Sequence, residues 1–222
     1  MISVASYANR INDKYNDARA QYSDIWAQID KLTEQMQQLH RERYKFTDGG
    51  FQEKERELSS KISALKDQLR NVSDGFTDSA EAIKAECKDR FRSRYGIDPG
   101  KVDNNAVILI QSGALSPAEL LALSDKYANN ATMRRLIGAE LLKSGDEEAQ
   151  SVGQVIIDDS KQQPHMDILN NLITIGHMAL RVDEGDGSTL EENRICSDGV
   201  AQEVYPDVFK RAHDTGLYID TD

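Results

Sequence analysis

Histidines, cysteines and acidic side chains are the residues whose types could do chemistry in this sequence. The histidines are scattered along the chain, at His40, His165, His177 and His213. The pair on one predicted helix, His165 and His177, is twelve positions apart, which is no metal-binding spacing. The two cysteines, Cys87 and Cys196, are 109 positions apart and form no disulfide framework. A reduced intracellular setting, either cytoplasm or virion, is therefore expected.

Motifs that carry out reactions are missing from the sequence. It has no Gly-rich phosphate loop and no G-x-S-x-G, H-E-x-x-H, C-x-x-C or G-x-G-x-x-G. The stretch 183–188, Asp-Glu-Gly-Asp-Gly-Ser, comes nearest to a calcium loop, but glycines without side-chain oxygens occupy its third and fifth positions. We therefore predict no catalytic residue, no metal and no cofactor, and we do not expect an enzyme.

A basic stretch with interleaved aromatic residues is the one pattern that resembles a nucleic-acid patch. Its cations are Lys84, Lys88, Arg90, Arg92 and Arg94, and its aromatic residues are Phe91 and Tyr95. Acidic residues sit among these cations, and cations near the end of a helix also complement the helix dipole. Nucleic acid is therefore not the expected partner.

The elements that would position any site begin with a long apolar seam. Apolar residues recur at alternating spacings of four and three, at Val4, Ala8, Ile11, Tyr15, Ala18, Tyr22, Ile25, Ile29, Leu32, Met36 and Leu39. This heptad pattern predicts a coiled-coil helix over 4–46. Thr47-Asp48-Gly49-Gly50 then has the residue types of a turn.

A second seam of the same kind predicts a helix over 51–95. Its apolar residues are Leu58, Ile62, Leu65, Leu69, Val72, Phe76, Ala80, Ile83, Cys87 and Phe91. Folding the chain back at Gly49 pairs the two seams with residue numbers that sum to 97–99, so that Tyr22 meets Phe76 and Tyr15 meets Ile83. A constant sum indicates an antiparallel hairpin. Trp26 lies off the seam, so we expect it to be exposed, where it either contacts a partner or packs on a neighbouring subunit.

The remainder of the chain is acidic and its pattern is helical. Residues 96–222 carry 10 Lys/Arg and 22 Asp/Glu, against 17 and 16 in residues 1–95. The apolar stretch 102–111 could be a strand or a buried helix, and its helical neighbours favour a helix. Further short helices are expected from the Ser116-Pro117 start, over 131–143 and over 146–161. The helix expected over 164–182 is apolar nearly all round, which is typical of a core or of a subunit interface. Such acidity disfavours DNA and anionic membranes and suits a basic protein surface.

The C-terminal residues read as a linker and an arm. A linker is expected at 183–188, and a short helix at 206–213. Apolar anchors on the otherwise polar arm are expected to dock on the chain itself or to bind a partner, at Tyr205, Phe209, Tyr218 and Ile219. No run of about 18 apolar residues predicts a membrane span, and the first residues lack the pattern of a secretory signal.

The sequence thus predicts an all-α protein in three segments. These are a long antiparallel coiled-coil hairpin over 1–95, a small acidic helical bundle over 97–182, and a linker with a C-terminal arm over 183–222. This layout resembles the helical head-assembly proteins of tailed phages, meaning scaffolding or internal virion proteins. The stretch 112–137, SGALSPAELLALSDKYANNATMRRLI, is similar in style to small structural proteins of phages of Gram-positive hosts.

Three functions compete at this point. The resemblance implies a non-enzymatic virion structural or assembly protein that binds itself and another protein, such as a phage capsid or portal protein. The acidic body is also compatible with a soluble phage-type inhibitor or regulator of a host protein complex. A nucleic-acid-associated coiled-coil protein is the third.

Overall fold

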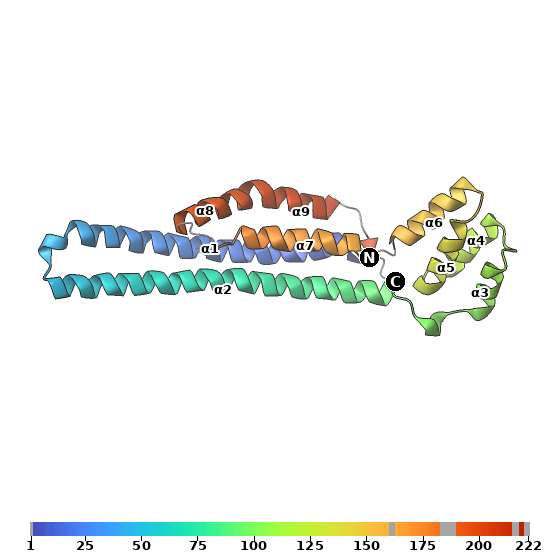
Figure 1. The fold of residues 1–222 in the computed structure, drawn as a ribbon, viewed down its shortest axis with the longest axis horizontal. Coiled ribbons are helices and arrows are strands. Elements are labelled where there is room, and N and C mark those ends of the chain that lie inside the picture. The colour runs from blue at the N-terminus through green and yellow to red at the C-terminus, as the bar shows by residue number, and fades with distance from the viewer. Residues whose placement is uncertain (1, 160–162, 183–189, 215–217, 220–222) are drawn as a thin grey trace. The chain divides into compact units, whose positions relative to one another are not determined.

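The chain is all-α. A computed structural model describes residues 2–159, 163–182, 190–214 and 218–219 (Figure 1). It confirms the predicted fold class: α1 (Val4–Arg41) and α2 (Asp48–Tyr95) form a long helix pair, and shorter helices follow. Contacts divide the chain into two compact units, one of residues 1–4, 84–168 and 216–222, the other of residues 5–83 and 169–215. The division into three consecutive segments stays a prediction.

The predicted apolar seams are the buried stripes of the two long helices. On α1 each seam residue is buried except Leu32 and Met36, which are half-buried. On α2 the residues from Phe76 to Phe91 of the seam are buried, and Leu58, Ile62 and Val72 are half-buried. The heptad pattern therefore locates the inward side of each helix along its whole length.

The turn between the helices lies earlier than predicted. Helix α1 ends at Arg41, a 3₁₀ turn η1 covers Arg43–Lys45, and α2 already begins at Asp48. Thr47 starts α2 because its Oγ1 accepts a hydrogen bond from the Gly50 N–H at 3.3 Å, and its carbonyl accepts one from Phe51 at 3.0 Å. Gly49 and Gly50 thus belong to the first helical turn, and neither has the positive φ expected of them.

The earlier turn also changes the pairing of the helices. The ring centroids of Tyr15 and Phe76 lie 6.0 Å apart, edge to face, although the index sum of 97–99 pairs Phe76 with Tyr22. Near the turn, His40 lies 3.2 Å from Glu55, which also gives a smaller sum. The predicted register is therefore wrong, by about three residues at His40 and by seven residues, about two helical turns, at Tyr15.

Two further helical segments complete the unit formed by residues 5–83 and 169–215. Helix α7 (Gln163–Met178) contributes its later turns, and α8 (Leu190–Gly199), a π-helical turn η3 (Val200–Val204) and α9 (Tyr205–Asp214) follow one another without a break. Figure 1 shows α8 and α9 running along α1 and α7. The expected arm with a helix over 206–213 is therefore a longer helical segment.

The apolar helix expected over 164–182 is buried by its own chain. Leu169, Leu172 and Ile173 are buried, whereas Asn171 and Thr174 are exposed, so the helix has one solvent-facing side. Gly176 lets α7 approach the aromatic centre of its unit, because a Cβ there would come 2.6 Å from Cζ of Phe76. A subunit interface is not needed to explain this apolar helix.

The other unit contains a bundle of four short helices. These are α3 (Asn104–Gln111), α4 (Pro117–Lys126), α5 (Ala131–Leu141) and α6 (Glu147–Asp159). Side chains cap all four starts: Asp103 at α3, Ser116 with Glu119 in a reciprocal capping box at α4, Asn130 at α5 and Asp146 at α6. The predicted helix starts at 116 and 131 are confirmed, and the short stretch over 102–111 is helical as expected.

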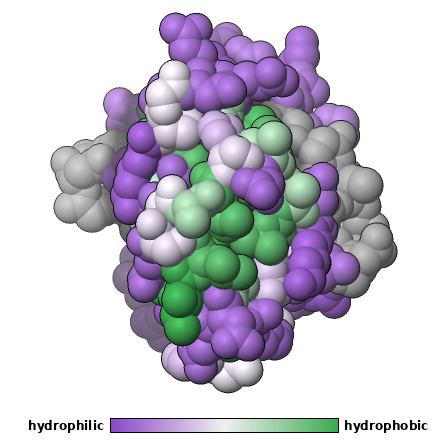
Figure 2. Space-filling view, turned by 90° about the vertical axis from the view of Figure 1, so that its right-hand side faces the viewer, coloured by the Kyte–Doolittle hydropathy of each residue, from purple (hydrophilic) through white to green (hydrophobic). Residues whose placement is uncertain are grey.

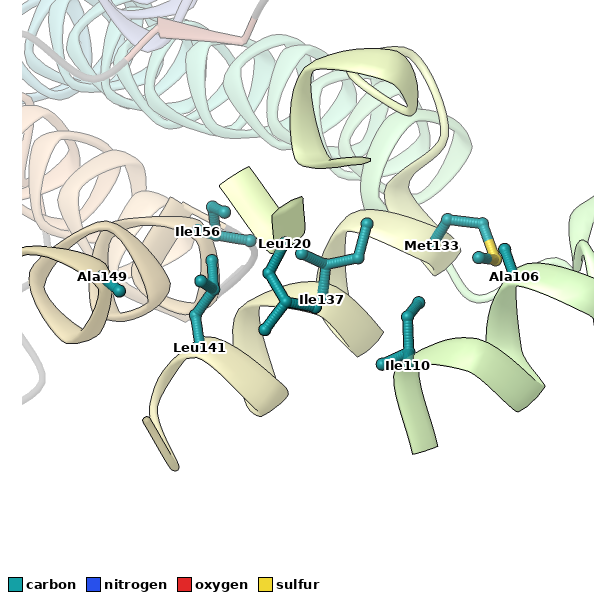
Figure 3. Packing of buried hydrophobic residues seen from close by; sticks show 8 residues of the cluster. All are labelled: Ala106, Ile110, Leu120, Met133, Ile137, Leu141, Ala149 and Ile156. Carbon is teal, nitrogen blue, oxygen red and sulfur yellow. The ribbon is translucent and has the colours of Figure 1, made fainter. Parts of the chain in front are cut away.

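The core of this α3–α6 bundle is a single apolar cluster (Figure 3). Its members come from all four helices: Ala106, Ile110, Leu120, Met133, Ile137, Leu141, Ala149 and Ile156. Two glycines bring α5 and α6 together, because a Cβ at Gly153 would lie 2.8 Å from the carbonyl oxygen of Gly138. In the same unit, the two-residue strands β1 (Ile2–Ser3) and β2 (Tyr218–Ile219) pair antiparallel, with Ile2 opposite Ile219.

Candidate protein-binding surfaces

Trp26 is buried, so its predicted exposure is wrong. Only 5% of its surface is accessible, because α8 covers it. The guanidinium of Arg194 lies over the indole ring, 5.0 Å from the ring centroid, and Tyr22 packs edge-on at 6.1 Å. Trp26 therefore contacts a segment of its own chain, and its contact with a partner stays a prediction.

Tyr205 is also buried, and it anchors α9 to the hairpin. Its ring stacks on Tyr15 with centroids 3.6 Å apart, and Tyr15 in turn meets Phe76 edge to face. Only 3% of Tyr205 is exposed. The contacts around it join α1, α2, α7 and α9, since Gly176 of α7 lies against both Phe76 and Tyr205. Tyr205 is consequently a core residue, not part of a free arm.

Three polar atoms under α8 and α9 are buried without a hydrogen-bond partner: Tyr15 Oη, Trp26 Nε1 and Tyr205 Oη. Burial raises the pKa of both tyrosines because it disfavours the charged phenolate. A buried polar group that lacks a partner costs about 1–3 kcal/mol. The contact between the C-terminal helical segment, residues 190–214, and α1 is thus closely packed, but three of its buried polar atoms lack a hydrogen bond.

Two arginines form ion pairs between α1 and α8, one arginine on each helix. Arg19 of α1 binds the Asp198 carboxylate and donates a hydrogen bond of 2.9 Å to the Ala179 carbonyl. Arg194 of α8 donates to both carboxylate oxygens of Asp30 at 2.9 Å. The Arg194 and Asp30 side chains are 35% and 50% exposed, and an exposed ion pair contributes little, about 0–1 kcal/mol.

The other expected partner residues lie elsewhere. Phe209 is half-buried on α9, where its ring lies 6.1 Å from that of His213. Tyr218 and Ile219 form β2, whose backbone pairs with β1 in the unit that also contains the α3–α6 bundle. The structure therefore places both Trp26 and Tyr205 in the contact between α1 and the helical segment formed by α8 and α9, and assigns Tyr218 and Ile219 to a different unit.

An exposed apolar face on α3 was not anticipated. Ile108 and Leu109 are 66% and 53% exposed, although the short apolar run was expected to be buried. Figure 2 looks onto the side that carries α3 and α4, and apolar surface gathers in its middle. The signal was in the sequence, since four consecutive apolar residues, 107–110, cannot all face one core from a helix.

A groove lies in the same bundle, at the end of α3. It has a volume of about 260 Å³ and is lined by Ile110, Gly113, Leu115, Pro117, Leu120, Glu140, Lys143, Ser144 and Gly145. Gly113, with φ of 67°, makes the turn that leads from α3 toward α4. We call Ile108 and Leu109 the α3 face.

The residues considered for chemistry are dispersed. His165 is buried against Phe91 at 5.1 Å, and Nδ1 of His177 lies 3.2 Å from Ser73 Oγ. Within the described ranges, no three histidine, cysteine or acidic side chains are grouped closely enough to hold a metal ion. Phe91 is 3% exposed, so the aromatic side chain within the basic stretch is not available to stack on a base.

No protein-family model, curated protein or solved structure matches the chain. Its fold and surfaces therefore have to be interpreted from their own geometry. In the part of the chain that the structure describes, no helix combines the length and the apolar character needed to cross a membrane. Two features are not accounted for by the packing of the chain. One is the exposed apolar α3 face, and the other is the set of buried polar atoms without hydrogen bonds beneath the C-terminal helical segment.

Proposed function

We propose that this chain is a non-enzymatic protein that acts through helical protein–protein contacts, as a structural or assembly protein of a phage particle. It would bind a second copy of itself and another protein, such as a capsid or portal protein, in the cytoplasm or in the virion. The α3 face carries this proposal, because Ile108 and Leu109 expose two neighbouring large aliphatic side chains on one short helix.

Charge supports a protein as the partner of the α3 face. Residues 97–159 contain ten Asp/Glu and five Lys/Arg, a net charge of −5, and the whole chain has a net charge of −11. A negative body repels nucleic-acid phosphates, whereas it attracts a basic protein surface over several ångströms. The exposed Ile108 and Leu109 lie on a negatively charged part of the chain. They therefore suit a partner that has an apolar patch flanked by Lys or Arg.

A second candidate function is supported by the same charge. An acidic domain with one apolar contact face could occupy a basic surface of a host complex and block it, as a soluble phage-type inhibitor would. The two functions differ in stoichiometry. An assembly protein is present in many copies in each particle, whereas an inhibitor binds one host complex in a fixed, small ratio.

Particle composition tests the proposal. Procapsids and virions from the source culture are purified by sedimentation, and the copies of the chain per particle are counted by quantitative mass spectrometry. We expect many copies in procapsids, virions or both. If the chain stays in the soluble fraction bound to a host complex, the inhibitor function replaces the assembly function.

The α3 face is tested by Ile108→Lys with Leu109→Lys. Both side chains are exposed, so the exchange leaves the bundle core intact and should abolish incorporation into particles. Gln150→Lys with Gln154→Lys on α6 is the matched control, because it adds the same charge at exposed polar positions of the same bundle. Loss of incorporation by both pairs would show that charge alone is responsible.

A further inference from the structure

The C-terminal helical segment, 190–214, buries few apolar side chains. Its buried residues are Asn193, Ser197, Tyr205 and Ala212. Two of these four are polar, and only Tyr205 is a large ring. Meanwhile Ile195 is 65% exposed and Val204 is 40% exposed. A helix that turns aliphatic side chains outward and polar ones inward is held less firmly than an ordinary amphipathic helix.

The surface beneath the segment is more apolar than the segment itself. Tyr15, Tyr22 and Trp26 of α1 are each at most 5% exposed. Tyr22 has a partner for its hydroxyl, the Arg181 carbonyl at 2.9 Å, but Tyr15 Oη and Trp26 Nε1 have none. Release of the segment would let water reach these two polar atoms, and it would also expose aromatic surface that must be covered again.

We infer that a second copy of this chain covers that surface, through exchange of segment 190–214, and of the strand β2 that follows it, between two protomers. The exchanged residues make the same contacts as before: Asp198 with Arg19, Arg194 with Asp30 and Trp26, Tyr205 with Tyr15, and β2 with β1. Because no contact is lost, exchange costs little beyond the association of two chains. The inference goes beyond the proposed function, since it needs neither a phage particle nor another protein.

The sequence that joins α7 to the segment suits such an exchange. Residues 183–189 lie outside the described residues, and their sequence is Asp-Glu-Gly-Asp-Gly-Ser-Thr. Three acidic residues and two glycines in seven positions are typical of linkers, and like charges within a linker favour its extension. An extended linker is what a segment needs to reach a neighbouring chain.

Two chains with one substituted cysteine each test the exchange. One carries Asp30→Cys on α1, and the other carries Arg194→Cys on α8 together with a tag that makes it heavier. Both carry Cys196→Ser, because Cys196 is the exposed native thiol, whereas Cys87 is buried. The chains are unfolded together and refolded at high protein concentration. Monomers and dimers are then separated, and a short bis-maleimide is added.

Exchange predicts a covalent dimer of one light and one heavy chain in the dimer fraction. Gln28→Cys in place of Asp30→Cys is the matched control. Gln28 is exposed on α1 two residues before Asp30, hence about 200° around the helix, and it should give no such product. Arg19→Cys with Asp198→Cys offers a second pair if the first variants fold poorly. Refolding to monomer alone, or a dimer fraction without the mixed product for either pair, would overturn the inference.

Discussion

Gly138 and Gly153 face each other where α5 meets α6, and a Cβ on either glycine would collide with the opposite helix. A Cβ at Gly153 would lie 2.8 Å from the Gly138 carbonyl oxygen and 2.9 Å from Cβ of Leu141. A Cβ at Gly138 would lie 2.8 Å from Cγ2 of Ile156. The obstacle at Gly153 is backbone, which cannot turn aside as a side chain can.

Gly153→Ala is therefore expected to destabilise the α3–α6 bundle. Alanine is the better helix former, but here its methyl group forces α5 and α6 apart, and overpacking of this kind costs about 1–3 kcal/mol. Thermal unfolding followed by circular dichroism measures the change. Unchanged or increased stability would show that α5 and α6 are not packed as closely as the structure has them.

Gly75→Ala is expected to have the opposite effect. Gly75 lies inside α2, a Cβ there would meet nothing within 4 Å, and its φ is not positive. It borders a hollow of about 370 Å³ lined also by Ala18 and Phe76. Alanine should raise the free energy of unfolding by up to about 1 kcal/mol because it disfavours the unfolded chain. A loss of stability comparable to that of Gly153→Ala would contradict this.

Much of this fold could be predicted from the pattern of apolar residues. The spacing of four and three identified the buried residues of α1 and α2, and Ser116 with Glu119 identified the start of α4. The register failed because the sequence shows two glycines and a threonine near the turn, and the choice of Thr47 as helix cap depends on local geometry. Local residue types therefore predict that a helix is present more reliably than they predict the residue at which it ends.

The candidate surfaces were harder to predict. Trp26 lies off the seam, so the sequence pattern places it in solvent, and only the return of α8 across α1 buries it. Trp26 and Arg194 are 168 positions apart in the sequence. The spacing of apolar residues within one helix gives no information about a contact between residues so far apart. Ile108 and Leu109 are exposed on a helix that was expected to be buried, because a run of apolar residues does not show which of its side chains the neighbouring helices cover.

Removing the Tyr205 hydroxyl should cost no stability. Tyr205→Phe keeps the ring that stacks on Tyr15 and deletes a buried oxygen without a partner. The free energy of unfolding should stay the same or rise by about 1 kcal/mol. Tyr22→Phe is the control, since it deletes a hydroxyl that donates to the Arg181 carbonyl, and it should cost about 0.5–1.5 kcal/mol. Denaturant unfolding measures the free energy of unfolding of both variants. An equal loss of stability in the two would contradict the expected difference.

Acid is expected to weaken the start of α3. A hydrogen bond from the Tyr127 hydroxyl, followed by those from the Ala106 and Asn105 amides, holds the pKa of Asp103 below its ordinary value of 3.8. A carboxyl group with a depressed pKa stabilises the fold above its unfolded pKa and loses that contribution as the pH falls through the folded pKa. Stability should therefore decline below about pH 4.

Asp103→Asn isolates this contribution. Asparagine still caps a helix, yet it has no charge to lose. The stability difference between the native chain and the variant should shrink as the pH is lowered from 7 toward about 3, as thermal unfolding at each pH will show. A difference that is independent of pH would mean that the Asp103 carboxylate does not hold α3 through its charge.

The copy number of the chain in purified particles tests the proposed function most directly. The proposal predicts many copies in procapsids or virions for the native chain and for Gln150→Lys with Gln154→Lys, but none for Ile108→Lys with Leu109→Lys. The contrary result is a native chain that never sediments with particles, or one whose incorporation survives the loss of Ile108 and Leu109.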